Sequence, residues 1–364
     1  MRDVLRSLID LLDSDDARPV ALCRVVGTSG SAPRELGAAM IVTEDDTVIG
    51  SVSGGCVESA LVHSARDVLT SGVAVVEHYG VDDPDDPAPG LTCGGQIEVL
   101  VERVAPTAER RRHLRRLITA LDDDEPISWA TTLTDDPEWY LATPASQPSW
   151  RRLDRDVADL LTTGRSGLIG VDDCDAPSDD RPRTFVQTFG PSARLILVGA
   201  NDFVRALSSL GTSLGMRVTV VDARPVFATR ARFPDADEVV VAWPDRYLAT
   251  QIREGRIGAS TAICVMTHDP KFDVPTLAIA LASPTLGFIG ALGSRRTVDD
   301  RNQRLRDAGI TDEQLERLRS PLGLDLGGHT PGEAAVAIAA QLIAERHRAT
   351  AKPLHTGDGP IHRR

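Results

Sequence analysis

Two cysteines, each beside a pair of glycines, are the residues of this chain best suited to chemistry. The first lies in Gly54-Gly55-Cys56 and the second in Cys93-Gly94-Gly95. A segment with apolar residues at helical spacing follows the first turn, which places Cys56 at a helix N-terminus. Backbone N–H groups and the helix dipole favour an anion there and lower the pKa of a thiol. The turns therefore indicate a surface that handles a cofactor; the alternative is that each cysteine is a small buried residue on a tight turn.

Two charged residues lie beside these turns. Arg34 is the cation at the end of a polar, turn-rich loop over residues 27–34. Glu58 follows the first glycine turn and opposes both an anion and a thiolate there, although it can instead cap the first turn of the helix.

The second half of the chain carries a nucleotide-binding pattern in altered form. Residues 194–199 form a predicted buried strand that ends at Gly199, a helical segment follows, and the next strand ends at Asp222 about twenty residues later. This is the βαβ layout of a Rossmann unit. Where a second glycine normally lets the backbone approach a pyrophosphate, Asn201 fills the space and Asp202 adds negative charge. Asp202 can alternatively be a helix N-cap, and Asp222 either accepts a ribose hydroxyl or is a plain strand-end carboxylate.

Further candidate residues follow later strands of the same half. Ligands of open parallel sheets bind beyond the carboxyl ends of the strands. His268, next to Asp269, could be an oriented acid-base group there, or a loop histidine without catalytic duty. Ser294 and Arg295 precede a helical segment, and we expect them to clamp an anion; the alternative is ordinary surface charge.

The order of predicted elements gives an α/β fold in two domains. We expect an N-terminal mixed α/β domain over residues 1–171, a polar, proline-rich linker over 172–189, a Rossmann-like doubly wound parallel sheet over 190–348 and a flexible tail over 349–364. Within the first domain, residues 126–133 resemble residues 19–26, since both segments follow a helix and begin with a proline. This similarity suggests a weak internal repeat.

Composition restricts the class of protein. The formal charge of −13 argues against nucleic acid and against an acidic membrane surface as partners. We find no apolar run near the eighteen residues of a membrane span and no long apolar core of a signal peptide. Five cysteines without CxxC spacing argue against a disulfide scaffold and suggest a reducing cytoplasm.

Taken together, these segments resemble the XdhC/CoxI family of molybdenum-hydroxylase accessory proteins. The resemblance covers nearly the whole chain except about residues 105–185. The segments that carry it are Gly30-Ser31-Ala32-Pro33-Arg34, residues 50–58, Cys93-Gly94-Gly95, residues 98–102, Thr267-His268-Asp269, residues 290–296, residues 323–328 and residues 330–333. One departure concerns the Rossmann turn, which usually runs Gly-Ala-Gly-His in the family but is Gly199-Ala200-Asn201-Asp202 here.

The resemblance implies a chaperone without turnover of its own. Such a protein binds molybdenum cofactor of the molybdopterin type, supports its sulfuration and passes it to a xanthine dehydrogenase or carbon monoxide dehydrogenase type enzyme. A thiolate is a soft ligand, so Cys56 would contact the molybdenum or carry sulfur as a persulfide, with Cys93 as the second thiol. The glycine N–H groups and Arg34 suit the anionic groups of the cofactor. The implied partners are the target hydroxylase, a cysteine desulfurase and a second copy of the chain.

Two alternatives stay open at this point. The fold of the second half alone would also suit an NAD(P)-dependent oxidoreductase with a degenerate Rossmann site, although the altered turn disfavours NAD(P). The second alternative is a binding module that has kept the fold but lost its ligand. The sequence does not distinguish the dinucleotide form of the cofactor from the form without a nucleotide.

Overall fold

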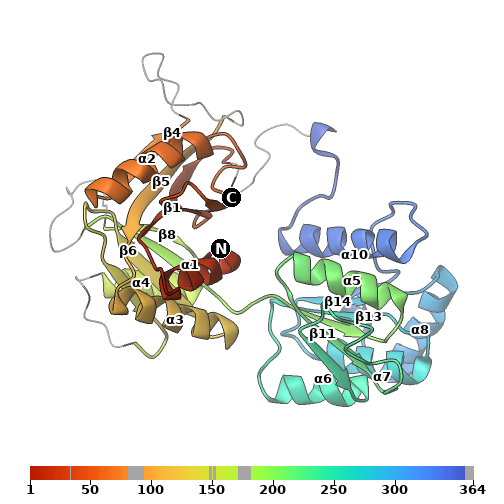
Figure 1. Ribbon diagram of the computed structural model, residues 1–364. Helices are drawn as coiled ribbons and strands as arrows, with labels where there is room; N and C mark the ends of the chain where they lie inside the picture. The colour runs from red at the N-terminus through yellow and green to blue at the C-terminus, as the bar shows by residue number, and fades with distance from the viewer. Residues whose placement is uncertain (33, 81–93, 147–149, 151–152, 171–181, 357–364) are drawn as a thin grey trace. The chain divides into compact units, whose positions relative to one another are not determined.

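The computed structural model describes residues 1–32, 34–80, 94–146, 150, 153–170 and 182–356. It divides the chain into two compact units, one ending at Pro191 and the next beginning at Ser192. The ribbon of each unit is shown in Figure 1. Every helix within the described ranges is too short or too polar to cross a lipid bilayer.

The first half of the N-terminal unit is built on a five-stranded antiparallel sheet. Its elements are α1 (Arg2–Asp13), β1 (Val20–Ser29), β2 (Ala39–Val42), β3 (Val48–Gly50), α2 (Glu58–Ser71), β4 (Val75–Tyr79) and β5 (Gln96–Val104), and the strand order is β3-β2-β1-β5-β4. Strand β1 is buried on both faces. Ala21, Cys23 and Val25 pack beneath α2, whereas Val20 and Leu22 face the rest of the unit. Burial on both faces explains why the sequence of β1 shows no alternation of polar and apolar residues.

The second half of the unit repeats this arrangement. Its elements are α3 (Ala108–Asp122), β6 (Ile127–Thr132), β7 (Trp139–Ala142), α4 (Asp154–Thr163), β8 (Gly167–Ile169) and β9 (Thr184–Phe189). The strand order β7-β6-β9-β8 matches β2-β1-β5-β4, each half places a helix before its first strand, and α4 occupies the position of α2. The internal repeat expected from residues 19–26 and 126–133 is therefore confirmed, because these segments lead into β1 and β6.

The end of the N-terminal unit differs from the sequence prediction. Residues 184–189, predicted as the last part of the linker over 172–189, form β9, which pairs along its whole length with β6. Thr184, Phe185 and Val186 are buried in this sheet. The pairing partners are more than fifty residues earlier in the chain, so no local pattern marks β9 as part of the domain. Residues 172–181 lie outside the described residues.

A buried ion pair joins the two halves of the unit. Arg24 of β1 donates from Nη2 to Glu102 Oε1 of β5 at 2.8 Å and to Thr131 Oγ1 of β6 at 2.7 Å. Its guanidinium lies 3.8 Å from the ring centre of Trp129, and Trp139 Nε1 donates to Glu102 Oε2 at 2.8 Å. Desolvation lowers the pKa of Arg24, and the charge of Glu102 opposes that effect. Polar contacts thus fix the two halves together inside an otherwise apolar core.

The second unit is the predicted doubly wound sheet. Its elements are β10 (Arg194–Val198), α5 (Asp202–Ser213), β11 (Arg217–Asp222), β12 (Glu238–Val241), α6 (Pro244–Arg253), β13 (Thr261–Val265), α7 (Pro270–Ala282), β14 (Phe288–Ala291), α8 (Arg295–Asp307), α9 (Asp312–Leu315), β15 (Leu318–Arg319), α10 (Pro331–Arg346) and the short 3-10 helix η1 (Leu354–Thr356). The strands are parallel in the order β12-β11-β10-β13-β14-β15. Helices α5 and α10 cover one face, and α6, α7 and α8 cover the other. The order reverses between β10 and β13, which makes the carboxyl edge there the expected ligand position.

Candidate functional site

The motifs of the first half meet at one end of the five-stranded sheet. The loops after β1 and β3 and the loop before β5 all lie at this end, because Ser29 pairs with Gln96 and Gly50 pairs with Met40. Gly95 lies directly against the loop after β1. A Cβ on Gly95 would come within 2.5 Å of the carbonyl carbon and oxygen of Ser31. The fold thus brings the segment around Ser31 and the second glycine pair into backbone contact.

The glycine turns have conformations that other residues rarely adopt. The φ angles are +86° at Gly54, +121° at Gly55 and +71° at Gly94. A side chain at any of these positions would therefore strain the backbone. Cys93 lies outside the described residues, so its pairing with Cys56 stays a prediction.

Cys56 differs from the other cysteines of the described part of the chain. It is half-buried, lies two residues before α2, and packs against the core beneath that helix. Cys23 and Cys264 are fully buried, and desolvation raises the pKa of each thiol to about 12. Both are core residues. Cys56 is thus the one of these three that a ligand can reach without unfolding.

The anion position at the first turn is filled by the chain itself. Glu58 Oε1 accepts from the backbone N–H groups of Ser53 at 2.9 Å and Gly54 at 3.0 Å, and Oε2 accepts from Gly55 N–H at 2.8 Å. Ser51 Oγ also donates to Oε1 at 2.7 Å. In this conformation the N–H groups of Gly54 and Gly55 already have an acceptor within the chain, and their contact with a cofactor stays a prediction. The acceptor is the side-chain carboxylate of Glu58, the first residue of α2.

These contacts also fix the charge of Glu58. Desolvation raises the pKa of its carboxyl group, but hydrogen bonds from Ser53, Ser51 and the backbone outweigh burial and hold the pKa far below its usual range. Glu58 therefore stays ionised throughout the ordinary acidic range. Because the folded state lowers the pKa of Glu58, its ionised carboxylate stabilises the folded loop fully at any pH above the pKa of the unfolded carboxyl group. This stabilisation is lost as the pH falls through the lower pKa of the folded state.

Glu58→Gln is expected to loosen the loop that carries Cys56. A glutamine has one acceptor oxygen and turns an N–H₂ donor towards the same N–H groups, so charge-assisted hydrogen bonds are lost. Amide hydrogen exchange over residues 51–57 should accelerate by about tenfold or more. In the unchanged protein, protection of this loop should persist from pH 7 to pH 4. Glu44→Gln, on an exposed carboxylate, is the control, and equal exchange in both variants would contradict the assigned role of Glu58.

Arg34 lies at the same end of the sheet, in the loop between β1 and β2. It is exposed and forms no ion pair with any other described residue. Among the described residues, Arg34 thus lacks the kind of internal partner that Glu58 gives the glycine N–H groups.

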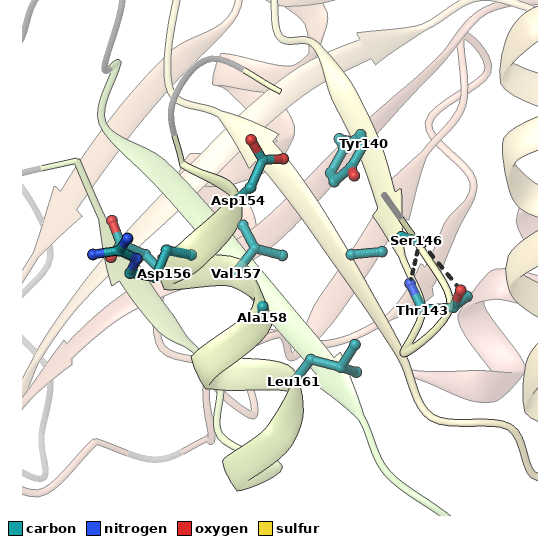
Figure 2. A pocket seen from close by; sticks show the side chains of 10 residues that line it. Tyr140, Thr143, Ser146, Asp154, Asp156, Val157, Ala158 and Leu161 are labelled. Atoms are coloured by element: carbon teal, nitrogen blue, oxygen red, sulfur yellow. Dashed lines mark hydrogen bonds between the residues drawn. The ribbon is translucent and has the colours of Figure 1, made fainter. Parts of the chain in front are cut away.

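The second half of the repeat builds the corresponding corner without a thiol. Helix α4 begins with Asp154, whose two oxygens accept from the Trp150 N–H at 2.8 and 2.9 Å, much as Glu58 begins α2 and accepts from the loop before it. Residues 143–153 contain neither cysteine nor glycine. A pocket of about 770 Å³ lies beside α4, and Figure 2 shows Tyr140, Asp154 and Leu161 on its walls. This fold therefore does not require Gly-Gly-Cys to start the helix.

In the second unit, the altered Rossmann turn is closed by its own side chain. Asn201 caps α5 by accepting from Val204 N–H at 3.1 Å, and its Nδ2 donates to the Met266 carbonyl at 2.8 Å. The N-cap is therefore Asn201 and not Asp202, which is the exposed first residue of α5. Gly199 is required as glycine, because its φ is +116° and a Cβ would come within 2.9 Å of Thr267 Cγ2.

The carboxylate of Asp222 is held by a neighbouring arginine. Arg224 donates from Nε to Oδ1 at 2.9 Å and from Nη2 to Oδ2 at 2.7 Å, and its backbone N–H donates to Oδ1 at 2.9 Å. The side chain of Asp222 is almost fully buried under this contact. Both oxygens of Asp222 thus have partners in the chain in this conformation, and the role of Asp222 as a ribose ligand stays a prediction.

The remaining candidate residues of the second unit, His268, Ser294 and Arg295, do not lie in one site. His268 lies on the wall of a pocket of about 470 Å³ at the carboxyl edge, beside Asn201 and Arg224. Ser294 instead caps α8, accepting from Thr297 N–H at 3.3 Å, and Arg295 is the exposed first residue of that helix. The described wall of the pocket includes neither of them. An anion clamp made of Ser294 and Arg295 is thus not part of this pocket.

Sequence reasoning passed over two other residues of this pocket. Phe227 and Arg232 lie on its wall, in the segment that follows β11. A phenylalanine with arginines close by in sequence, soon after the strand that carries Asp222, is the signal that could have identified them.

Comparison with known proteins agrees with this architecture. The model of the XdhC and CoxI family matches residues 14–80, and the model of the XdhC Rossmann domain matches residues 195–342. A relative from Bacillus subtilis (strain 168), named as a probable subunit of xanthine dehydrogenase, is 30% identical over 346 residues, which cover 94% of this chain and 97% of the relative. The chain belongs to the XdhC and CoxI family.

Two further comparisons extend over most of this XdhC-family chain. The molybdenum cofactor insertion chaperone PaoD of Escherichia coli (strain K12) is 26% identical over 325 residues, which cover 89% of this chain and 81% of PaoD. A crystal structure described as a xanthine dehydrogenase from Bacillus halodurans matches with a TM-score of 0.71 and 26% identity, covering 97% of this chain and 98% of that one. The two-unit architecture is therefore that of a solved protein.

The C-terminal family segments mostly stabilise the second unit of this XdhC-family chain. Thr330 Oγ1 accepts from Glu333 N–H at 3.2 Å and Glu333 Oε2 accepts from Thr330 N–H at 2.9 Å, which together form a capping box at the start of α10. These hydrogen bonds lower the pKa of Glu333 to about 2.

Across the described ranges, which leave out Cys93, no three His, Cys, Asp or Glu side chains converge as metal ligands.

Proposed function

We propose that this XdhC-family chain binds molybdenum cofactor and delivers it to a xanthine dehydrogenase type hydroxylase, with the Cys56 loop as the binding site. Family membership and the names of the B. subtilis and E. coli relatives support the cargo and the kind of target. The observation that carries the site is the half-buried Cys56 on a glycine turn. The matching corner at Asp154 shows that the fold alone does not demand this turn.

The chemistry of the loop suits an anionic cargo with a soft metal. The Cys56 thiolate would approach the molybdenum of the cargo, or hold a sulfur atom as a persulfide that a cysteine desulfurase supplies. Because Glu58 occupies the N–H groups of Gly54 and Gly55, Arg34 is the group that receives the phosphate of the cargo. Contact between the loops at Ser31 and Gly95 gives the site a rigid wall.

Other parts of the proposal rest on the family alone. They are the sulfuration step, a carbon monoxide dehydrogenase type enzyme as the other target and a homodimer. A cytoplasmic location rests on the cysteine usage of the sequence. Hydride transfer from NAD(P)H has only the Rossmann-type sheet in its favour, and the side chains of Asn201 and Arg224 already form internal hydrogen bonds at the turn and at Asp222.

Retention of the cargo tests the proposal directly. Purified protein is mixed under anaerobic conditions with molybdenum cofactor released from a donor enzyme, passed over an ultrafilter, and assayed by pterin fluorescence after oxidation. The protein should retain the pterin and should activate a cofactor-free hydroxylase when the two are mixed. Pterin that passes entirely through the filter, with no activation of the hydroxylase, would overturn the proposal.

A further inference from the structure

The loop that carries Arg34 is held at both of its ends. At the first end, Ser31 lies against Gly95 of the second glycine pair, which belongs to the same half of the repeat. At the second end, Gly37 lies against Gln187 of β9, which belongs to the other half. The cofactor proposal uses the first contact and leaves the second without a role.

A tight turn follows Arg34 directly. The Ala38 N–H donates to the Glu35 carbonyl at 3.1 Å, which closes a four-residue turn, and the φ angle of Gly37 in its third position is +80°. A positive φ at that position is typical of a type II turn and favours glycine. The Gly37 N–H also donates to the Val25 carbonyl of β1 at 2.7 Å. The turn thus fixes the path of the chain from Arg34 into β2.

The amide group of Gln187 fills the space in which any other residue at position 37 would place its side chain. A Cβ on Gly37 would come within 1.9 Å of Gln187 Nε2 and 2.4 Å of its Cδ. Nε2 also donates to the Gly37 carbonyl at 3.3 Å. Gln187 is 5% exposed, and Leu36 packs against a cluster that contains Phe185 of β9. Strand β9 therefore supports the turn through a hydrogen bond and through side-chain packing.

The counterpart of Gln187 in the first half of the repeat has a different role. Gln187 pairs with Trp129 across β9 and β6, and Glu102 pairs with Leu22 across β5 and β1. Trp129 and Leu22 are each the third residue of their strand, so Gln187 takes the place of Glu102 in the repeat. Glu102 belongs to the buried ion pair of the core. The same place in the repeat thus serves the core in one half and the Arg34 loop in the other.

We infer that Gln187 is a positioning residue for the proposed cofactor site and acts through Arg34. Its hydrogen bond keeps the turn at Gly37 in one conformation, so less conformational entropy is lost when the Arg34 guanidinium meets the phosphate of the cargo. This inference rests on the proposed function, in which Arg34 receives that phosphate. It gives the second half of the repeat, whose own corner lacks a thiol, a part in the site.

Amide hydrogen exchange over residues 34–38 of the cofactor-free protein tests the contact. Gln187→Met keeps a long side chain of similar size but has no donor for the Gly37 carbonyl. Exchange over this segment should be about five- to tenfold faster than in the unchanged protein. Gln251→Met, on a buried glutamine of the second unit, is the matched control and should leave this exchange unchanged. Gln187→Thr is too short to reach Gly37 and serves as the test if Gln187→Met does not fold.

A double-mutant cycle with Arg34→Gln tests whether Gln187 acts on the cofactor through Arg34. Gln187→Met should weaken retention of molybdenum cofactor about three- to tenfold and make retention less sensitive to salt, as Arg34→Gln should. Adding Gln187→Met to Arg34→Gln should cause little further loss, because the group that Gln187 positions is already gone. A role in stability alone would lower retention equally with and without Arg34 and would leave its dependence on salt unchanged.

Two results would overturn the inference. They are unchanged exchange over residues 34–38 in Gln187→Met, and equal losses of cofactor retention from Gln187→Met with and without Arg34→Gln. Failure of the unchanged protein to retain any pterin counts against the proposed function and, with it, against an effect of Gln187 on the cofactor. Normal retention by the unchanged protein together with unchanged exchange in Gln187→Met counts against the role of Gln187 alone.

Discussion

Cys56→Ser is expected to lower the affinity for molybdenum cofactor by at least about tenfold and to reduce activation of the target hydroxylase in proportion. Loss of a group that merely supports a metal ligand already weakens metal binding about 10–100-fold, so loss of a direct soft ligand should not do less. Serine keeps the size and the hydrogen bonding of cysteine but is a hard, uncharged oxygen ligand at neutral pH. The same ultrafiltration and pterin fluorescence assay measures the effect.

The matched control for this prediction is Cys264→Ala. It removes a thiol whose pKa is raised to about 12 by burial in β13, so that thiol does not act as a thiolate at neutral pH. The control should retain as much cofactor as the unchanged protein, and amide exchange over residues 51–57 should stay the same in Cys56→Ser. Full retention and full activation by Cys56→Ser would leave Cys56 as a small residue on a tight turn and would remove the site from the proposal.

Local patterns were enough to predict most of the fold. The βαβ unit that ends at Asp222 followed from a buried run, a helical spacing and a second buried run, and the structure contains β10, α5 and β11 at those places. The repeat followed from two segments that each come after a helix. These features depend on side-chain periodicity within a few turns or strands, which the sequence states directly. The resemblance to the XdhC/CoxI family was likewise confirmed, because its motifs are long and spread over both units.

What the sequence could not show is which polar groups satisfy one another. The turn at Gly54 and Gly55 was correctly recognised as a donor of N–H groups, but the path of the loop decides that Glu58 accepts them. At the end of β11 the spacing predicted Asp222 as a ligand for ribose, and only the structure shows that Arg224 donates to both of its oxygens. Charge alone cannot separate these outcomes, since a carboxylate that binds a ligand and one that is paired internally look the same in sequence.

Arg24 provides the largest expected effect on stability. Arg24→Met leaves Glu102 buried with its charge unpaired, and removes the hydrogen bond to Thr131 between the two halves of the repeat. Breaking a buried pair on one side destabilises proteins by about 3–5 kcal/mol. We expect a loss of that size in the free energy of unfolding of the N-terminal unit. Urea unfolding followed by fluorescence of Trp129 and Trp139, which lie beside this pair, measures it.

Two further variants decide whether the loss comes from an uncompensated charge. Arg24→Met combined with Glu102→Met removes both charges, and it should be less destabilised than the sum of the single variants. Arg18→Gln breaks an exposed pair with Glu44, 3.3 Å apart, and should change stability by about 0–1 kcal/mol. A loss below about 1 kcal/mol in Arg24→Met would mean that water reaches Glu102. The two halves of the repeat would then be held together by their apolar contacts and not by this ion pair.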